Sequence, residues 1–227
     1  SYSVTGVQTC ALPISLRHIA RAGVRVAYVP LIAETNMGNS ESMVRWVKND
    51  SGFTYDFAVM DRYLDLVEKT QGKPDLVVLV VWDIYVDKEA IGDRRLEGEA
   101  VIEDRLKEGG RGPTVTAMID GKAGQHRVPH YSEAAAVDAG RPVAAALLER
   151  MEKRGLADRL AVGIETDTTP IKEAVELWKT LLPQAGWVRH AHSGRAIAHG
   201  VPVVYNCDVW PPRFIANPTE GEPAGWA

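Results

Sequence analysis

Two carboxylates stand two residues apart at the end of an apolar run, LAVGIETD, over residues 160–167. In a β-strand Glu165 and Asp167 would point to the same side, because side chains alternate along a strand. Gly163 and Ala161 share that parity, and such small residues suit a crowded interior. Two neighbouring carboxyl groups can divide their roles, because repulsion and burial raise the pKa of one while the other stays ionised. We therefore take this pair as the catalytic candidates, with the acid and base chemistry that cleavage of a glycosidic bond requires.

Other polar and aromatic side chains follow further apolar runs, where they could hold a substrate. These candidates are Glu34, Asn36, Trp82, Asp83, His190, His192, Tyr205, Asp208 and Trp210. The aromatic side chains among them could stack on sugar rings. A structural interpretation competes with the functional one, because a strand-end carboxylate such as Asp167 can cap the next helix and a tryptophan often only packs.

The two histidines could also bind a metal ion. His190 and His192 share a strand face, and a His-X-His pair with a later acid resembles the ligand set of metal-dependent hydrolases on barrels. In those enzymes the pair usually ends the first strand, whereas here it lies in the fifth of the six predicted strands. We therefore expect no obligatory metal or cofactor, and the metal-dependent hydrolase stays an alternative. Serine or cysteine chemistry is weakly supported, since G-x-S-x-G is absent and Cys207 lacks an evident activating partner.

Six apolar runs separated mostly by helical patterns must position these residues. The predicted strands are residues 24–32, 75–83, 113–120, 160–167, 187–194 and 201–210. The predicted helices are residues 57–72, 141–155 and 170–182, with Pro142 and Pro170 in the first turns of the last two. Asp120 and Gly121 predict a turn that returns residues 125–131 as a hairpin arm.

Alternating strands and helices of this kind imply parallel β/α units. An α/β fold of the (β/α)8 TIM-barrel type, truncated at its N-terminus, fits best. An open doubly wound sheet is the alternative, but it would usually carry a glycine-rich phosphate loop, and neither G-x-G-x-x-G nor G-x-x-x-x-G-K-[ST] occurs.

The beginning of the chain does not fit this pattern. The uncharged run VTGVQTCALPI over residues 4–14 resembles the in-frame translation of a common sequencing adapter. We therefore treat residues 1–14 as a non-native segment and residues 15–227 as a partial barrel domain. The expectation is that the native N-terminus is missing and that the C-terminus could also be cut.

Composition limits the partners. A net charge of −4 argues against a nucleic-acid partner, and no run of 18 apolar residues exists to cross a membrane. Apart from Cys10 in the adapter-like segment, Cys207 is alone, so the domain has no internal disulfide. Localisation is left open, with export of the full-length protein as one option, and so is the oligomeric state.

The order of segments resembles the catalytic barrel of glycoside hydrolase family 123 and its uncharacterised relatives, over about residues 55–210. The run DRYLDLVEK followed by DLVVLVVWD carries this resemblance, as does LAVGIETDTTPIKEAVELWKTLLPQAGW. The resemblance implies action on glycans that contain N-acetylgalactosamine, with an adjacent Asp and Glu at this strand end and assistance from the substrate's acetamido group. Asp167 would match the family's Asp, but Thr168 occupies the Glu position, and Glu165 could substitute from the same strand face.

The sequence thus predicts a glycoside hydrolase-like barrel that acts on polysaccharide or glycan through Asp167 and Glu165. His190, His192, Asp83 and Tyr205 would orient the carbohydrate substrate. Because Thr168 stands in place of an acid, a non-catalytic carbohydrate-binding barrel is the alternative interpretation.

Overall fold

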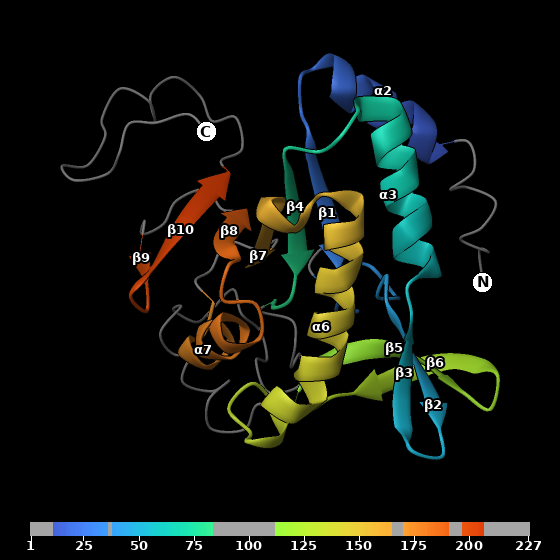
Figure 1. Cartoon of the computed structure of the whole chain (residues 1–227), viewed down its shortest axis with the longest axis vertical. Helices are drawn as coiled ribbons and strands as arrows, with labels where there is room; N and C mark the ends of the chain where they lie inside the picture. Colours follow the sequence, from blue (N-terminus) through green and yellow to red (C-terminus); the bar gives the residue numbers. More distant parts are fainter. Residues whose placement is uncertain (1–10, 36–37, 84–111, 165–169, 191–196, 207–227) are drawn as a thin grey trace, which may run out of the picture.

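The computed structural model describes residues 11–35, 38–83, 112–164, 170–190 and 197–206. These residues form two sheets and the helices that join their strands (Figure 1). The larger sheet contains β1 (Val26–Pro30), β4 (Leu76–Val80), β7 (Leu160–Ile164), β8 (Gly186–His190), β9 (Ile197–Ala198) and β10 (Val201–Asn206). The smaller sheet contains β2 (Arg45–Asn49), β3 (Gly52–Asp56), β5 (Thr114–Ile119) and β6 (Lys122–Arg127). The helices are α2 (Ala11–Arg21), α3 (Ala58–Gln71), α6 (Ala135–Arg154) and α7 (Lys172–Leu181), with a 3-10 turn at Ala157–Arg159.

The strands of the larger sheet follow one another in chain order. The order is β1-β4-β7-β8-β10-β9, and every neighbouring pair is parallel except β10 with β9. The hairpin of β2 and β3 and then helix α3 lie between β1 and β4, α6 precedes β7, and α7 joins β7 to β8. A barrel wall has this sequential order, whereas a doubly wound sheet reverses it at a switch point. The predicted parallel sheet is therefore confirmed. The described strands do not close into a barrel, so closure remains a prediction.

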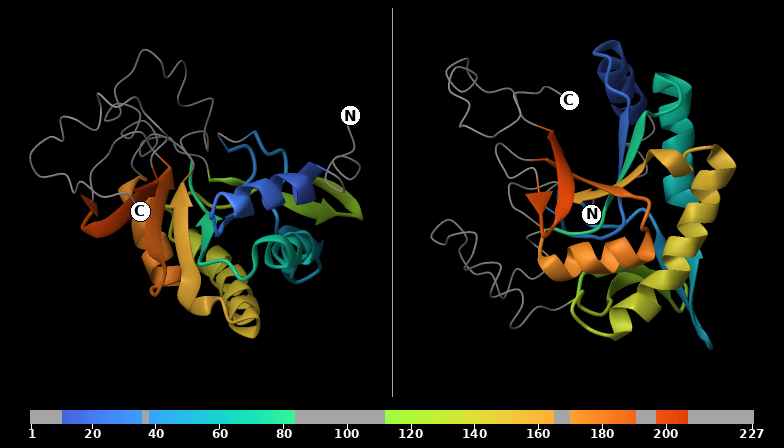
Figure 2. Two further views of the ribbon diagram at one scale, coloured as in Figure 1. Left: turned by 90° about the horizontal axis from the view of Figure 1, so that it is seen from above. Right: turned by 60° about the vertical axis from the view of Figure 1, so that its left-hand side comes forward.

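The two faces of this sheet are covered differently. Val77, Leu79, Leu160 and Val162 belong to the main core, which also contains buried residues of α3, α6 and α7. The opposite face carries a separate small cluster of buried side chains. It consists of Val78, Ala161 and Val188, with the half-buried Val26, Tyr28 and Leu76 against it. Figure 2 shows the helices gathered on one side of the strands. Helices on one face are typical of a barrel, whose other face is the interior.

Gly163 lies in a crowded place between β4 and β8. A Cβ atom at this position would lie 2.5 Å from the carbonyl oxygen of Val188 and 2.7 Å from a methyl carbon of Val78. The prediction that Ala161 and Gly163 face a crowded side, opposite Leu160 and Val162, is thus confirmed.

The smaller sheet corrects one prediction. The strand predicted at residues 113–120 is β5, and it pairs with β2 and β6 rather than with the strands of the larger sheet. The predicted hairpin turn is confirmed, because Asp120 and Gly121 both have positive φ, 51° and 74°, between β5 and β6. The hairpin of β2 and β3 was not predicted. Both hairpins lie beyond the C-terminal ends of β1 and β4 (Figure 1).

Helix boundaries differ from the predictions at two prolines. Helix α6 begins at Ala135, so Pro142 lies inside it rather than in its first turn. A proline there forfeits one backbone hydrogen bond. The loss is tolerated because Ala136, Val143 and Leu147 anchor the helix in the core. Helix α7 begins at Lys172, so Pro170 precedes it.

Helix α2 includes residues that sequence reasoning had set aside. It begins at Ala11, and Leu12 packs half-buried against the core. Residues 11–14 therefore take part in the described fold. None of the helices among the described residues is long and apolar enough to span a membrane.

Candidate functional site

Parallel register brings the ends of the strands to one edge of the larger sheet. Pro30 pairs with Val80, Val80 with Gly163, and Gly163 with Val188. At β10, Val204 pairs with Val188. Strands β1 and β4 end at this line, β7 ends one residue beyond it, and β8 and β10 end two residues beyond it. Segments far apart in the sequence are thus brought to one edge, as the barrel interpretation requires.

The segment after β1 carries Glu34 in an unusual conformation. Glu34 is half-buried and has φ of 60°, the left-handed region that side chains other than glycine seldom adopt. Its backbone N–H donates to the carbonyl oxygen of Asn39 at 2.7 Å. The Asn39 side chain accepts from the backbone N–H of Thr35 at 3.1 Å, and it donates to the carbonyl oxygen of Ile32 at 2.9 Å. Asn39 therefore holds the loop that fixes Glu34.

The same segment is fastened to the smaller sheet. The backbone N–H of Ala33 donates to the carbonyl oxygen of Thr114 at 2.7 Å. Ser42 and Thr116, both buried, exchange two hydrogen bonds, each from a backbone N–H to the partner's hydroxyl, at 2.8 and 2.9 Å. The smaller sheet thus braces the strand-end loop of β1, because an exchanged pair of buried hydrogen bonds allows little displacement.

The segment after β4 is buried. Trp82 is 1 % exposed and Asp83 is fully buried. The Tyr131 hydroxyl donates to the carbonyl oxygen of Val81 at 2.7 Å, which ties the end of β4 to the segment after β6. Burial raises the pKa of the Tyr131 phenol well above its usual value, and the charge of Asp83 raises it further. A phenol with this pKa stays protonated at neutral pH and acts as a hydrogen-bond donor.

His130 lies beside Tyr131 and is also buried. Its ring meets the Tyr131 ring edge-on, with centroids 5.6 Å apart. Its Nδ1 lies 2.8 Å from the hydroxyl oxygen of Ser132, and its backbone N–H donates to the Glu133 carboxylate at 2.7 Å. The turn after β6 is therefore ordered by side-chain hydrogen bonds as it reaches back to β4.

Sequence reasoning did not single out Asn39, His130 or Tyr131 as site residues. The last two fall in a segment predicted only as a hairpin arm. The available signal was local, since a His and a Tyr followed by Ser and Glu favour a hydrogen-bonded turn. Contact with the end of β4 is a tertiary feature without a local signal.

Several predicted site residues lie outside the described residues. These are Asn36, Glu165, Asp167, His192, Asp208 and Trp210. His190 and Tyr205 are described by their backbone, as the last residue of β8 and the fifth of β10. Register pairs His190 with Asn206 and Tyr205 with Arg189. Among the described residues, no three His, Cys, Asp or Glu side chains form a group that could hold a metal ion.

Comparison with known proteins adds to this geometry. No curated protein matches the sequence. A family model does match, over a range that starts earlier than the predicted resemblance and ends well before Glu165 and Asp167. It covers β1, β4 and the strand-end segments that carry Glu34 and Asp83. The predicted resemblance is confirmed over this range: residues 10–105 of this chain match the model of the glycoside hydrolase 123 catalytic domain.

Proposed function

We propose that residues 15–227 form part of a (β/α)8 barrel that hydrolyses glycosidic bonds in a polysaccharide or glycan. The observation that carries this proposal is that five parallel strands end at one edge of the larger sheet. The described helices pack on one face of this sheet, and the small cluster of Val78, Ala161 and Val188 lies on the opposite face. The family match over residues 10–105 supports a carbohydrate substrate. Active sites of β/α barrels are built at this edge.

In this proposal Asp167 and Glu165 are the catalytic carboxylates. They follow β7, whose last residue is Ile164 and whose neighbours in the sheet are β4 and β8. One carboxyl group would protonate the leaving oxygen, while the other stabilises the positive charge that develops on the sugar ring. The resemblance adds N-acetylgalactosamine-containing glycans as the substrate class, with the acetamido group assisting.

The substrate-holding residues fall into two groups. Glu34 is half-exposed, so it can meet a sugar hydroxyl directly. Trp82 and Asp83 are buried, so they support the site from beneath the surface. The remaining members of the proposed set are Asn36, His190, His192, Tyr205, Asp208 and Trp210.

The full chain tests this function with aryl N-acetylgalactosaminides of both anomers and a polysaccharide panel. We expect measurable turnover that falls by about 10²-fold or more in Asp167→Asn, the usual cost of losing a catalytic acid or base. Binding of the glycan, measured by calorimetry, should remain. Asp158→Asn is the matched control, because Asp158 is exposed in the 3-10 turn just before β7.

Turnover that is unchanged in both Asp167→Asn and Glu165→Gln would refute the assigned carboxylates. A chain that neither binds nor cleaves any of these carbohydrates would refute the function itself.

A second function has one observation in its favour. Thr168 follows Asp167 where the family resemblance places an acid. Without a catalytic acid the same strand-end surface would bind carbohydrate and not cleave it. Saturable binding without turnover, together with gain of activity in Thr168→Glu, would favour this non-catalytic reading.

A further inference from the structure

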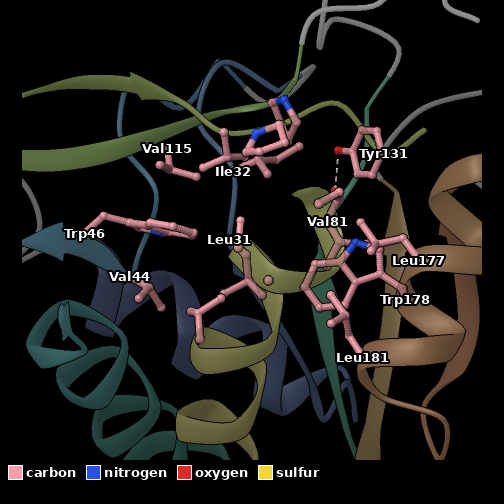
Figure 3. A pocket seen from close by; sticks show the side chains of 17 residues that line it. Leu31, Ile32, Val44, Trp46, Val81, Val115, Tyr131, Leu177, Trp178 and Leu181 are labelled. Carbon is pink, nitrogen blue, oxygen red and sulfur yellow. Dashed lines mark hydrogen bonds between the residues drawn. The ribbon is translucent and has the colours of Figure 1, made fainter. Parts of the chain in front are cut away.

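An apolar cavity separates the smaller sheet from helices α6 and α7. Its volume is about 60 Å³. The side chains around it come from the smaller sheet, from the segments that follow β1 and β4, from the segment between β6 and α6, and from both helices (Figure 3). They include Leu31, Trp46, Val81, Val115, Val143 and Leu181. The cavity lies on the helix side of the larger sheet, since Leu31 and Val81 belong to the main core. It is distinct from the proposed active site, because none of Glu34, Trp82 and Asp83 lines it.

One polar atom in this cavity wall has no hydrogen-bond partner. Trp178, on α7, lines the cavity and is 8 % exposed. Its indole Nε1 is buried without an acceptor in the described part of the chain. The Tyr131 hydroxyl in the same wall is already engaged, because it donates to the carbonyl oxygen of Val81 (Figure 3). Native proteins leave few buried donors unpaired, so this N–H calls for an acceptor.

Water fits this place poorly. A buried water usually makes two to four hydrogen bonds, and apolar cavities stay dry. The wall is nearly all aliphatic and aromatic, with Pro113, Pro129, Ala136 and Leu177 completing it between the named side chains. A molecule with an apolar body and a single hydrogen-bond acceptor matches both the wall and the indole donor.

We propose that this cavity binds a small neutral molecule with an apolar body and one acceptor oxygen, such as a short ketone or aldehyde, hydrogen-bonded to Trp178 Nε1. The volume limits its size. A cavity of about 150 Å³ accommodates benzene, so 60 Å³ admits a smaller molecule of only a few heavy atoms.

Acetone and isobutene test the proposal as a matched pair. They have nearly the same shape, and only acetone accepts a hydrogen bond. Each is titrated into the ¹⁵N-labelled full chain while the indole N–H resonances are followed, with the Trp178 signal assigned by its loss in Trp178→Phe. We expect saturable shifts with both molecules and a downfield indole proton shift with acetone only.

Trp178→Phe keeps an aromatic wall and removes the donor. The ratio of the acetone to the isobutene dissociation constant, followed at other cavity resonances, should rise by roughly threefold to tenfold in this variant. An unchanged ratio would overturn the hydrogen bond to the ligand.

Filling the cavity gives the second control. Ala139 lines the cavity on α6, whereas Ala146 on the same helix does not. Ala139→Leu should abolish binding of both molecules and Ala146→Leu should leave it intact. If Ala139→Leu does not fold, Leu181→Ala makes the opposite change and should admit benzene. Absence of saturable shifts in the native chain, or a water cross-peak at the Trp178 indole proton, would overturn the proposal.

Discussion

At the scale of single residues, Glu34 combines a carboxylate that solvent reaches with a backbone conformation that favours glycine. Such conformations cost free energy and persist where the surroundings impose them, often at functional sites. Here the hydrogen bond to Asn39 and the link from Ala33 to Thr114 impose it. The loop therefore holds this carboxylate at the strand end against a local conformational preference.

Glu34→Gly should separate function from stability. Relief of the left-handed conformation offsets the added flexibility of the unfolded chain, so the free energy of unfolding should change by no more than about 1 kcal/mol. Glycan affinity should fall, because the carboxylate is lost. Asp120→Gly, at an exposed hairpin turn with φ of 51°, is the control and should leave affinity unchanged. Equal glycan affinity in both variants would remove Glu34 from the site.

Tyr131→Phe should destabilise the fold. It removes the hydroxyl that donates to the carbonyl oxygen of Val81 in a buried environment, and the loss of such a hydrogen bond costs about 0.5–1.5 kcal/mol. Urea unfolding should show a lower midpoint with an unchanged slope. Tyr55→Phe is the matched control, at a half-buried tyrosine of β3, and should cost less than about 0.5 kcal/mol.

The same tyrosine predicts a dependence of stability on alkaline pH. Burial and the charge of Asp83 raise the folded-state pKa of Tyr131 above its unfolded value near 10. The stability linked to this group is therefore complete below pH 10 and is lost as the pH rises toward the folded-state pKa. Between pH 10 and 11 the unfolding midpoint should fall more steeply in the native chain than in Tyr131→Phe. If the unfolding midpoint fell equally steeply with pH in both proteins, the raised pKa of Tyr131 would be contradicted.

At the scale of elements, the sequence predicted which side chains of a strand share a face, but it did not predict which sheet a strand joins. Continuous apolar runs predicted β4 and β7, and the small Ala161 and Gly163 correctly predicted the crowded face. The same kind of run at β5 was assigned to the wrong sheet, because an apolar strand does not encode its partner. The charged hairpin of β2 and β3 gave too weak a pattern to be predicted.

The site itself was only partly predictable for the same reason. Residues that follow a strand, such as Glu34 and Asp83, can be found from the position of the apolar run. Tyr131 reaches the end of β4 from a turn fifty residues later, and no local pattern signals such a contact.

Gly163→Ala should report on the close approach of β7, β4 and β8. The added Cβ would lie 2.5 Å from a backbone oxygen of β8, so the strands must separate, at a cost of about 1–3 kcal/mol or more. Gly186→Ala is the control within β8, where the added methyl would meet nothing within 4 Å. Equal unfolding midpoints for the two variants would contradict the observed packing.

At the scale of the whole molecule, the larger sheet has an open side in the part of the chain that the structure describes. In the described residues β1 pairs with β4 alone, and its other edge pairs with no strand. The half-buried Val26 and Tyr28 lie on the face that a closed barrel would enclose. Unpaired edge strands favour association between chains.

We therefore expect the chain to self-associate with rising concentration in sedimentation velocity runs. Val26→Lys should suppress this association, because a charge on an edge strand opposes pairing. Val24→Lys, at an exposed position just before β1, is the control and should have little effect. A monomer at all concentrations, with cooperative unfolding at a high midpoint, would count against an open edge.

The smaller sheet also bears on the order in which the chain folds. Its central pairing joins β2 to β5, and the hydrogen bonds between Ser42 and Thr116 span 74 residues of sequence. Contacts of such long range are slow to form, since a large loop must close before they contribute. The pairings of β7 with β8 and of β8 with β10 join residues much closer in sequence and can form first, whereas β4 and β7 pair across a separation as long as that between β2 and β5. Substitutions between β2 and β5 would then accelerate unfolding and leave the folding rate almost unchanged.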